Sequence, residues 1–351
     1  MEENFKLISQ VELKESLATT WQAPSNIALV KYWGKYGMQL PANPSISFTL
    51  NACRTITSVK ATKGEPGFNI SYDGMPKPDF ASKIKAYLER VVDYCPWVRN
   101  YYFDIDTHNT FPHSSGIASS ASSMAALSAC IMDFESELTG TALDYHKMSF
   151  LSRLGSGSAC RSIQGAAVLW GAHKDTANSS NFYGVDQTQL LHPVFQDFQD
   201  TILLVDKGEK VVSSSVGHDL MNDHAFAKAR FEQAQKNLTT IKKALQEGDL
   251  DTFIKITESE ALTLHAMMMT SHPYFILMKP HTLSIIDEIW AFRKETKIPV
   301  CFTLDAGANV HMLFPSAYKM ELDELMNNKL ASYCQNSHYI CDEIGTGAKK
   351  C

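Results

Sequence analysis

Hydrophobic and polar positions in the first half of the chain alternate mostly with the two-residue period of β-strands. Residues 45–62, SISFTLNACRTITSVKAT, predict two strands joined near Asn51. Residues 67–74, GFNISYDG, predict a further strand that ends in an Asp-Gly turn. Other segments of this half predict strands at residues 18–31, 101–107 and 165–171, and helices at residues 83–94, in a segment that ends at about Glu137, and at residues 144–154.

Helical spacing dominates the second half of the chain, which follows a polar, loop-like segment at residues 175–189. A strand-rich half followed by a half of helices and strands predicts an α+β fold with two lobes and a boundary near residues 185–200. We therefore assign residues 1–190 to an N-terminal domain and residues 191–351 to a C-terminal domain. The second half has helical patterns at residues 218–247, 250–269, 280–295 and 316–333, and strand patterns at residues 201–206, 300–305, 309–314 and 338–344.

The composition is that of an ordinary globular protein, with 44% hydrophobic and 20% charged residues in a chain long enough for two hydrophobic cores. A net charge of −6 argues against a nucleic-acid partner. The acidic, mixed N-terminus does not have the pattern of a signal peptide, and no apolar run approaches the ~20 residues of a membrane span. The eight cysteines are scattered without Cys-x-x-Cys spacing, which is typical of buried thiols rather than of disulfides or zinc ligands. These features predict a reduced, cytoplasmic protein.

Residues 110–127, TFPHSSGIASSASSMAAL, contain a run of small residues that leads into a helix. Small side chains allow a phosphate to approach backbone N–H groups, and a helix N-terminus favours an anion at the same place. The hydroxyl groups of this segment could hold phosphate oxygens or a magnesium shell. The same composition is also typical of tight helix packing, and the Gly-Lys-Ser/Thr of a Walker loop is missing. The serines in question are Ser114, Ser115, Ser119, Ser120, Ser122 and Ser123.

Two further segments contain cations in positions that suit phosphate binding. In APSNIALVKYWGK, residues 23–35, Lys31 and Lys35 flank a phenol and could bind a phosphate or diphosphate, although solvated lysines at a strand end would give the same pattern. In GSGSACRS, residues 155–162, two glycines expose N–H groups and Arg161 offers a planar fork for a phosphate or carboxylate. A simple Gly-Ser turn is the alternative for the second segment.

A candidate proton acceptor lies in TLDAGANVHML, residues 303–313, where Asp305 follows an apolar strand. With a cation beside it, this carboxylate could orient or remove a proton, although Asp before Ala-Gly is often only a turn residue. Ser259 and His265 lie on a helical pattern, in which a histidine is more often a buried, hydrogen-bonded residue than a catalyst. No Gly-x-Ser-x-Gly elbow is present, so we discount a hydrolase triad.

Taken together and in this order, these segments resemble the mevalonate diphosphate decarboxylases of the GHMP superfamily of small-molecule kinases. The combination of KYWGK and SGSACRS is specific to that family, whereas the Ser/Gly loop indicates only the superfamily. The matching segments are NIALVKYWGK (26–35), FPHSSGIASSAS (111–122), GSGSACRS (155–162), VSSS (212–215), the region of Ser259 and His265, and LDAGAN (304–309).

The resemblance implies a fold, a reaction and the partners that go with it. The fold would be the two-lobed GHMP kinase fold, with an N-terminal lobe like domain 2 of ribosomal protein S5, a ferredoxin-like C-terminal lobe and the active site between them. The reaction would be the ATP- and Mg²⁺-dependent decarboxylation of 5-diphosphomevalonate to isopentenyl diphosphate, carbon dioxide, ADP and phosphate. The protein would be a cytoplasmic homodimer with small-molecule ligands, without a nucleic-acid or membrane partner.

The resemblance also implies roles for individual residues. Asp305 would orient or deprotonate the 3-hydroxyl group, and Arg161, supported by Asn26, would bind the substrate carboxylate. Lys31, which opens its motif, would be a further catalytic residue. Tyr32, Lys35, Ser158 and Lys83 would bind the diphosphate. The residues that would hold the ATP phosphates are Ser115, Gly116, Ala118, Ser119, Ser120 and Ser123, with Ser120 also binding magnesium.

Departures from the family pattern leave the phosphate count of the substrate open. Ala308 stands where proline is usual, and no basic pair is evident at residues 75–85, where Lys77 or Lys83 could serve instead. The alternatives are a related enzyme that phosphorylates or decarboxylates mevalonate or its 5-phosphate, and a non-catalytic sensor. Asp305 and Arg161 argue against a sensor. The atypical loop residues are His113, Ser114, Ser115, Ile117, Ser122 and Ser123.

Overall fold

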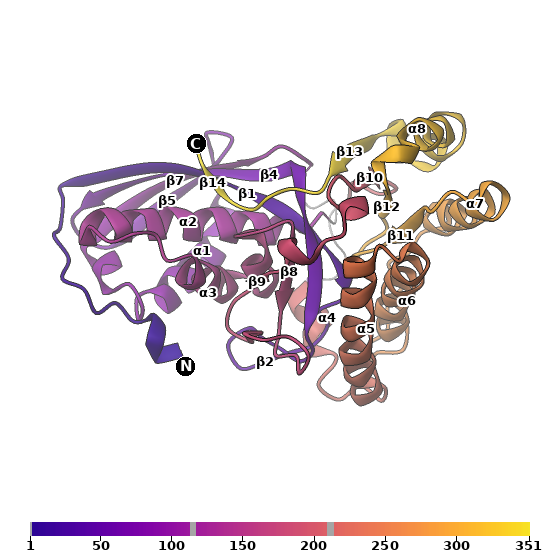
Figure 1. The fold of residues 1–351 in the computed structure, drawn as a ribbon. Helices are drawn as coiled ribbons and strands as arrows, with labels where there is room; N and C mark the ends of the chain where they lie inside the picture. Colours follow the sequence, from indigo (N-terminus) through magenta and orange to yellow (C-terminus); the bar gives the residue numbers. More distant parts are fainter. Residues whose placement is uncertain (1, 113–116, 209–213) are drawn as a thin grey trace.

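Two β-sheets, each with its own helices, form two lobes in the computed structural model, which describes residues 2–112, 117–208 and 214–351. The helices of the N-terminal lobe lie on one face of the larger sheet, and the C-terminal helices lie beside the smaller sheet (Figure 1). The α+β class and the two-lobed arrangement are therefore confirmed. The division between residues 190 and 191 stays a prediction.

The larger sheet has the strand order β14-β1-β4-β7-β5-β6, with β8 paired to β4 and β9 paired to β8. All described pairings in it are antiparallel except that of β5 with β7. A separate small hairpin, β2 Lys35–Tyr36 and β3 Leu40–Pro41, follows β1. The elements of the lobe are β1 Ser16–Val30, β4 Ser45–Lys63, β5 Gly67–Tyr72, β6 Met75–Pro76, α1 Ala81–Val91, β7 Tyr101–Asn109, α2 Ser119–Thr139, α3 Tyr145–Gly155, β8 Ala167–Trp170, β9 Val185–Asp186 and β14 Lys349–Lys350.

The smaller sheet is antiparallel, with the order β11-β12-β10-β13. The last residues of the chain leave this sheet and return to the N-terminal lobe, where β14 pairs with β1 (Figure 1). The elements of the C-terminal lobe are β10 Gln199–Leu203, α4 Ser214–Asp219, α5 Ala227–Glu247, α6 Leu250–Met269, α7 Pro280–Thr296, β11 Cys301–Thr303, β12 Val310–Phe314, α8 Lys319–Asn328 and β13 Tyr339–Glu343.

The prediction of two strands joined near Asn51 is wrong, because β4 is one strand of 19 residues. Its pairing with β1 shifts register between Pro24 and Asn26, where proline cannot donate a ladder hydrogen bond. At the same place the carboxylate of Asp342, in β13, accepts the backbone N–H groups of Asn51, Ala52 and Cys53 at 2.6–2.9 Å. The C-terminal lobe thus satisfies the donors that the irregular part of the strand would otherwise leave unpaired.

Two long helical patterns of the second half are shorter than predicted. The pattern at residues 218–247 divides into α4 and α5 around a turn in which His224 bonds the carbonyl of Met267 at 3.0 Å and accepts from the N–H of Phe226. The pattern at residues 316–333 gives α8 with 3₁₀ turns on either side. Side-chain hydrogen bonds compete with helical ones at these ends.

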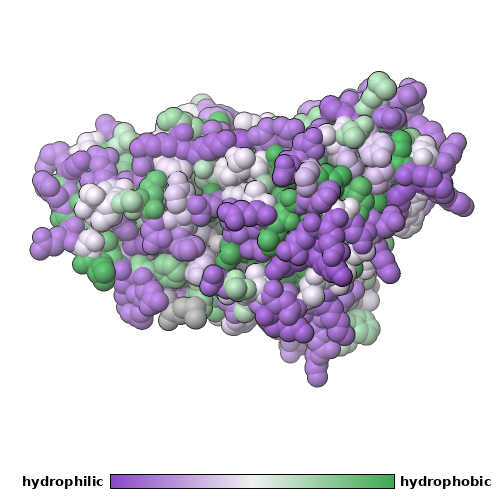
Figure 2. Space-filling view, viewed as in Figure 1, coloured by the Kyte–Doolittle hydropathy of each residue, from purple (hydrophilic) through white to green (hydrophobic). Residues whose placement is uncertain are grey.

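The hydrophobic core continues from one lobe into the other. Ile27, Leu29 and Phe48 of the large sheet share one buried cluster with Phe198 and Phe253 of the C-terminal lobe. Figure 2 shows a mainly hydrophilic surface on which hydrophobic residues gather where the lobes meet. A shared core fixes the lobes relative to one another, so residues that approach from either lobe meet in a defined geometry. Across residues 2–112, 117–208 and 214–351, no helix combines the length and the apolar character that a membrane span requires.

Candidate active site

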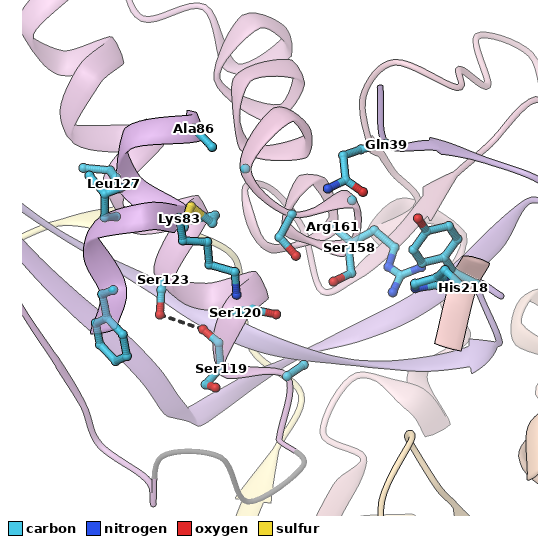
Figure 3. A pocket seen from close by; sticks show the side chains of 18 of the residues that line it. Gln39, Lys83, Ala86, Ser119, Ser120, Ser123, Leu127, Ser158, Arg161 and His218 are labelled. Atoms are coloured by element: carbon cyan, nitrogen blue, oxygen red, sulfur yellow. Dashed lines mark hydrogen bonds between the residues drawn. The ribbon is translucent and has the colours of Figure 1, made fainter. Parts of the chain in front are cut away.

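A cavity of about 660 Å³ lies where the two lobes meet and is lined by residues of both. One side is formed by α1, the start of α2 and the large sheet; the other contains the turn after α3, the end of β1 and residues of the C-terminal lobe (Figure 3). Most predicted site residues line this one cavity. They are Lys31, Tyr32, Lys35, Lys83, Ala118, Ser119, Ser120, Ser123, Ser158, Arg161 and Asp305.

Lys31 and Asp305, 274 residues apart, form an ion pair in the cavity wall. The Lys31 amine lies 3.3 Å from Oδ1 of Asp305, and Lys31 is only 1% exposed whereas the Asp305 side chain is 26% exposed. Burial lowers the pKa of the Lys31 amine; the carboxylates of Asp305 and Glu260 oppose that effect. The sequence predicted a cation beside Asp305 in general terms, and Lys31 is that cation.

The backbone of Lys31 is held by a fully buried ion pair of the C-terminal lobe. Its N–H donates to Oε2 of Glu260 at 2.9 Å, and its carbonyl accepts from Arg230 at 3.2 Å. Arg230, in α5, binds the carboxylate of Glu260, in α6, through both Nη atoms at 3.0 and 2.5 Å, and Asn237 adds a fourth donor at 2.6 Å. The Arg230–Glu260 pair is bidentate, and the remaining lone pairs of the Glu260 carboxylate accept other donors. The end of β1 is therefore held in one geometry.

His265, in α6, supports Asp305 through the backbone. Its Nε2 donates to the Asp305 carbonyl at 3.2 Å. The residue is 1% exposed, and burial is the main cause that lowers the pKa of its imidazole to about 4. The prediction of a buried, hydrogen-bonded histidine is therefore confirmed, and its contact fixes the turn that carries the candidate proton acceptor.

Arg161 lies buried in the 3₁₀ turn Gly157–Ser162 that follows α3. Its guanidinium donates to Oδ1 of Asn26 at 3.3 Å and to the hydroxyl of Ser45, and it lies 6.0 Å from the centre of the Trp170 ring. Asn26 is placed behind it and donates to the Ser158 carbonyl at 3.2 Å. These contacts orient the planar fork while part of it still faces the cavity.

Tyr32 and Lys35 border the same part of the cavity. The Tyr32 ring packs edge-on against Trp170, with the ring centres 4.7 Å apart, and burial raises the pKa of its phenol well above 10. Lys35 lies 3.7 Å from Asp219 of α4. A Cβ at Gly157 would lie 3.0 Å from the Tyr32 hydroxyl and 2.8 Å from the Trp170 ring, so this turn must carry glycine to pass so close.

The start of α2 forms the opposite wall. Ala118, with φ +46°, brings the chain into the helix, and Ser119, Ser120 and Ser123 face the cavity (Figure 3). The hydroxyl of Ser123 donates to the Ser119 carbonyl at 2.6 Å. The helix of 21 residues therefore presents N-terminal N–H groups and hydroxyls at one place.

Some predicted contacts of this loop differ from the structure or fall outside it. Ser122 is buried and lies 2.6 Å from the Thr55 hydroxyl in β4, so it serves packing rather than a ligand. Ser115 and Gly116, and the first two residues of VSSS (212–215), lie outside the described residues. Lys83, in α1, extends toward Ser119 and Ser120, on the opposite side of the cavity from Arg161 (Figure 3). Lys83 therefore lies beside the start of α2, away from Arg161 and Ser158 (Figure 3).

Comparison with known proteins identifies the family. Residues 23–181 match the family model "Diphosphomevalonate decarboxylase-like N-terminal domain", and residues 201–347 match "Mevalonate 5-diphosphate decarboxylase C-terminal domain". The diphosphomevalonate decarboxylase of Debaryomyces hansenii is 31% identical over 304 residues, which cover 82% of this chain and 76% of that protein. The chain belongs to the mevalonate diphosphate decarboxylase family.

Solved decarboxylase structures share this fold over nearly the whole chain. The enzyme from Legionella pneumophila is 30% identical, with a TM-score of 0.77 over 92% of this chain and 100% of the other. The enzyme from Enterococcus faecalis, described with mevalonate diphosphate and ATP, is 26% identical with a TM-score of 0.80, over 96% and 99% of the two chains. A complex of MDDEF with MVAPP, AMPPCP and magnesium is 27% identical with a TM-score of 0.81, over the same shares. The predicted resemblance and fold are thus confirmed.

Several residues that line the cavity or hold its wall in place escaped the sequence analysis. Arg230 and Glu260 carried a usable signal, because each is a charged residue on the buried stripe of an amphipathic helix: Arg230 precedes Ala234, Leu238 and Ile241 at helical spacing. His218, in α4, also lines the cavity. The only sequence signal for it was its position shortly after the VSSS segment.

Proposed function

We propose that this decarboxylase-family chain catalyses the ATP-dependent conversion of 5-diphosphomevalonate to isopentenyl diphosphate, carbon dioxide, ADP and phosphate. The observation that carries the proposal is that the Lys31–Asp305 pair, Arg161 and the start of α2 line one cavity. A carboxylate for the hydroxyl proton, a fork for the substrate carboxylate and a cradle for phosphates are the three parts that this reaction needs. The names of the relatives support the same reaction.

In the first step, the 3-hydroxyl oxygen attacks the γ-phosphorus of ATP. The O–P bond to the β-phosphate breaks, ADP leaves, and the hydroxyl proton passes to the carboxylate of Asp305. Lys31 holds that carboxylate in place at 3.3 Å, and His265 holds its backbone. Little covalent chemistry falls to the protein, so the alignment of these groups is its main contribution.

In the second step, the tertiary C3–O bond breaks and inorganic phosphate leaves. The electron pair of the bond between C2 and the carboxylate then forms the C2–C3 double bond, and carbon dioxide departs. Arg161 orients the substrate carboxylate, with Asn26 and Ser45 holding the guanidinium. Tyr32, Lys35 and Ser158, on the same side of the cavity, bind the diphosphate through a phenol, an ammonium group and a hydroxyl.

The nucleotide fits the side of the cavity opposite Arg161 and Ser158. The N–H groups and hydroxyls at the start of α2 suit its phosphates, Lys83 extends toward them, and an apolar wall that includes Ile84, Ile105 and Leu127 suits the base. Within the described ranges, no cluster of three or more His, Cys, Asp or Glu residues forms a metal site. The hydroxyl of Ser120, at the start of α2, would hold magnesium together with the ATP phosphates, because Mg²⁺ keeps several waters and few protein ligands. When bound there, magnesium neutralises charge on the transferred phosphate.

The test is turnover with three acceptors. Purified protein is incubated with magnesium and ATP and, separately, with mevalonate, its 5-phosphate and its 5-diphosphate, and ADP and carbon dioxide are measured. Equal amounts of both products from the diphosphate alone would support the proposal. ADP without carbon dioxide, or preference for another acceptor, would move the activity to a related kinase or phosphomevalonate decarboxylase. Absence of turnover with all three would favour a binding protein.

We propose further that the chain works in the cytoplasm as a homodimer. All eight cysteines are free thiols, six of them buried, which fits a reducing compartment. The homodimer rests on the family resemblance. Light scattering after size-exclusion chromatography tests it, and a mass near 39.1 kDa would contradict it.

A further inference from the structure

His218 occupies a position in the cavity wall that the proposed mechanism does not use. It comes from α4 in the C-terminal lobe and is 8% exposed. Its imidazole lies between two rings of the N-terminal lobe, with centres 4.1 Å from that of Tyr32 and 4.8 Å from that of Trp33. Two aromatic neighbours fix the plane of the imidazole, so the directions of its two nitrogen atoms are also fixed.

One hydrogen bond defines which nitrogen carries the proton. The backbone N–H of Gly34 donates to Nδ1 of His218 at 3.0 Å. Since a peptide nitrogen can only donate, Nδ1 must be the acceptor, and the proton of the neutral ring is on Nε2. Gly34 cannot be replaced without strain, because its φ is +94° and a Cβ there would lie 2.9 Å from Cζ of Phe231.

The surroundings keep this ring neutral. Burial is the largest cause, followed by the charges of Lys35 and Arg161, and together they lower the pKa of His218 to about 3. Among residues 2–112, 117–208 and 214–351, no group is seen to accept the Nε2 proton. The His218 side chain is more than nine-tenths buried and lies beside two cations, and its Nε2 donor has no partner among those residues, so it is complementary to an anionic oxygen.

We propose that Nε2 of His218 donates a hydrogen bond to a phosphate oxygen at the C5 end of the substrate. The inference rests on the proposed function, and it adds a neutral donor to the cationic groups of the same pocket. Figure 3 places His218 with Arg161 and Ser158, across the cavity from Ser119, Ser120 and Ser123, so the phosphate is that of the substrate and not of ATP. A neutral donor with one fixed direction selects the position of the oxygen rather than only its charge.

The test uses two variants that distinguish the role of Nδ1 from the role of Nε2. His218→Asn keeps an acceptor near Gly34 but has no donor at the position of Nε2, whereas His218→Gln can place an amide N–H there. Affinity for 5-diphosphomevalonate is measured by calorimetry without nucleotide, and affinity for ATP is measured separately. His218→Asn should weaken substrate binding ~10- to 100-fold, the usual worth of a hydrogen bond to a charged group, and leave ATP affinity within about twofold. His218→Gln should recover most of the loss.

The outcomes separate this inference from the proposed function. If wild-type protein does not bind the diphosphate, the proposed function itself fails. If wild-type protein binds it and His218→Asn binds it equally well, only the role of His218 is wrong. Equal weakening by the Asn and Gln variants, or a parallel loss of ATP affinity, would show that His218 only packs against Tyr32. His218→Phe, which keeps an aromatic ring, provides the same comparison if the Asn variant does not fold.

Discussion

The backbone N–H of Lys31 donates a 2.9 Å hydrogen bond to the carboxylate of Glu260, 229 residues further along the chain. The first residue belongs to the N-terminal lobe and the second to α6 of the C-terminal lobe. Arg230 neutralises Glu260 and also binds the Lys31 carbonyl at 3.2 Å. The ion pair that joins the lobes therefore also sets the position of Lys31, and we expect stability and activity to depend on the same contacts.

Replacing Glu260 should destabilise the protein strongly, because it leaves the buried Arg230 cation without a counter-charge. We expect Glu260→Gln to lower the free energy of unfolding by about 3 kcal/mol. Urea denaturation measures the change. The matched control is Glu247→Gln, at the exposed pair of Glu247 with Lys243 at 3.8 Å, where a change below about 0.5 kcal/mol is expected.

Replacing both charges should separate stability from activity. The double variant Arg230→Met, Glu260→Met removes the uncompensated charge, so its stability should exceed that of Glu260→Gln. The kcat of this double variant should be lower than that of the wild type, because the Lys31 N–H has lost its acceptor. A double variant with normal kcat would mean that the pair stabilises the lobes without positioning Lys31.

Asp305 should be required for turnover and not for substrate binding. Asp305→Asn retains the size of the side chain but cannot accept the hydroxyl proton, so we expect kcat to fall at least ~10³-fold with substrate Kd nearly unchanged. Steady-state kinetics and calorimetry measure the two quantities. Asp323→Asn, in the exposed pair with Lys319, serves as the control. Near-normal turnover by Asp305→Asn would rule out the carboxylate as the base.

Replacing Arg161 by lysine should reduce activity, although the positive charge is kept. A lysine amine cannot reproduce the planar contacts to Asn26 and Ser45 while also binding the substrate carboxylate. We expect kcat/KM for the substrate to fall ~10²-fold or more, with the affinity for ATP retained. The exposed Arg99 provides the matched Arg→Lys control. Wild-type kinetics in Arg161→Lys would contradict a carboxylate clamp.

Local sequence patterns predicted most elements and many of the residues that line the cavity. Asp305 and Arg161 could be recognised because each is a charged side chain beside a Gly-containing turn, where backbone N–H groups are exposed to a ligand. The course of β4 past Asn51 was not predictable, because its N–H groups are satisfied by Asp342, 289 to 291 residues away. The support of Lys31 by Glu260 and the tautomer of His218 also depend on contacts between the lobes. Such contacts leave at most an indirect signal, such as a charge on an apolar helical stripe.

The protein should lose stability in mild acid because His265 is neutral in the folded state. Its folded pKa, about 4, is depressed from 6.5, so below pH 6.5 the unfolded state binds more protons than the folded state. Stability therefore falls as the pH drops from 6.5 toward 4, by about 3 kcal/mol from this residue. His218, with a pKa of about 3, acts in the same direction and extends the loss to lower pH.

Comparing variants isolates the contribution of His265 to this pH dependence. His265→Gln removes the titrating group, so its free energy of unfolding should change less between about pH 6.5 and about pH 4 than that of the wild type. The exposed His338 gives the control, since His338→Gln should follow the wild-type slope. Urea denaturation across the range measures all three slopes. A His265→Gln slope equal to that of the wild type would mean that the folded protein binds a proton at His265 as readily as the unfolded chain does, which would contradict a neutral His265 in the folded state.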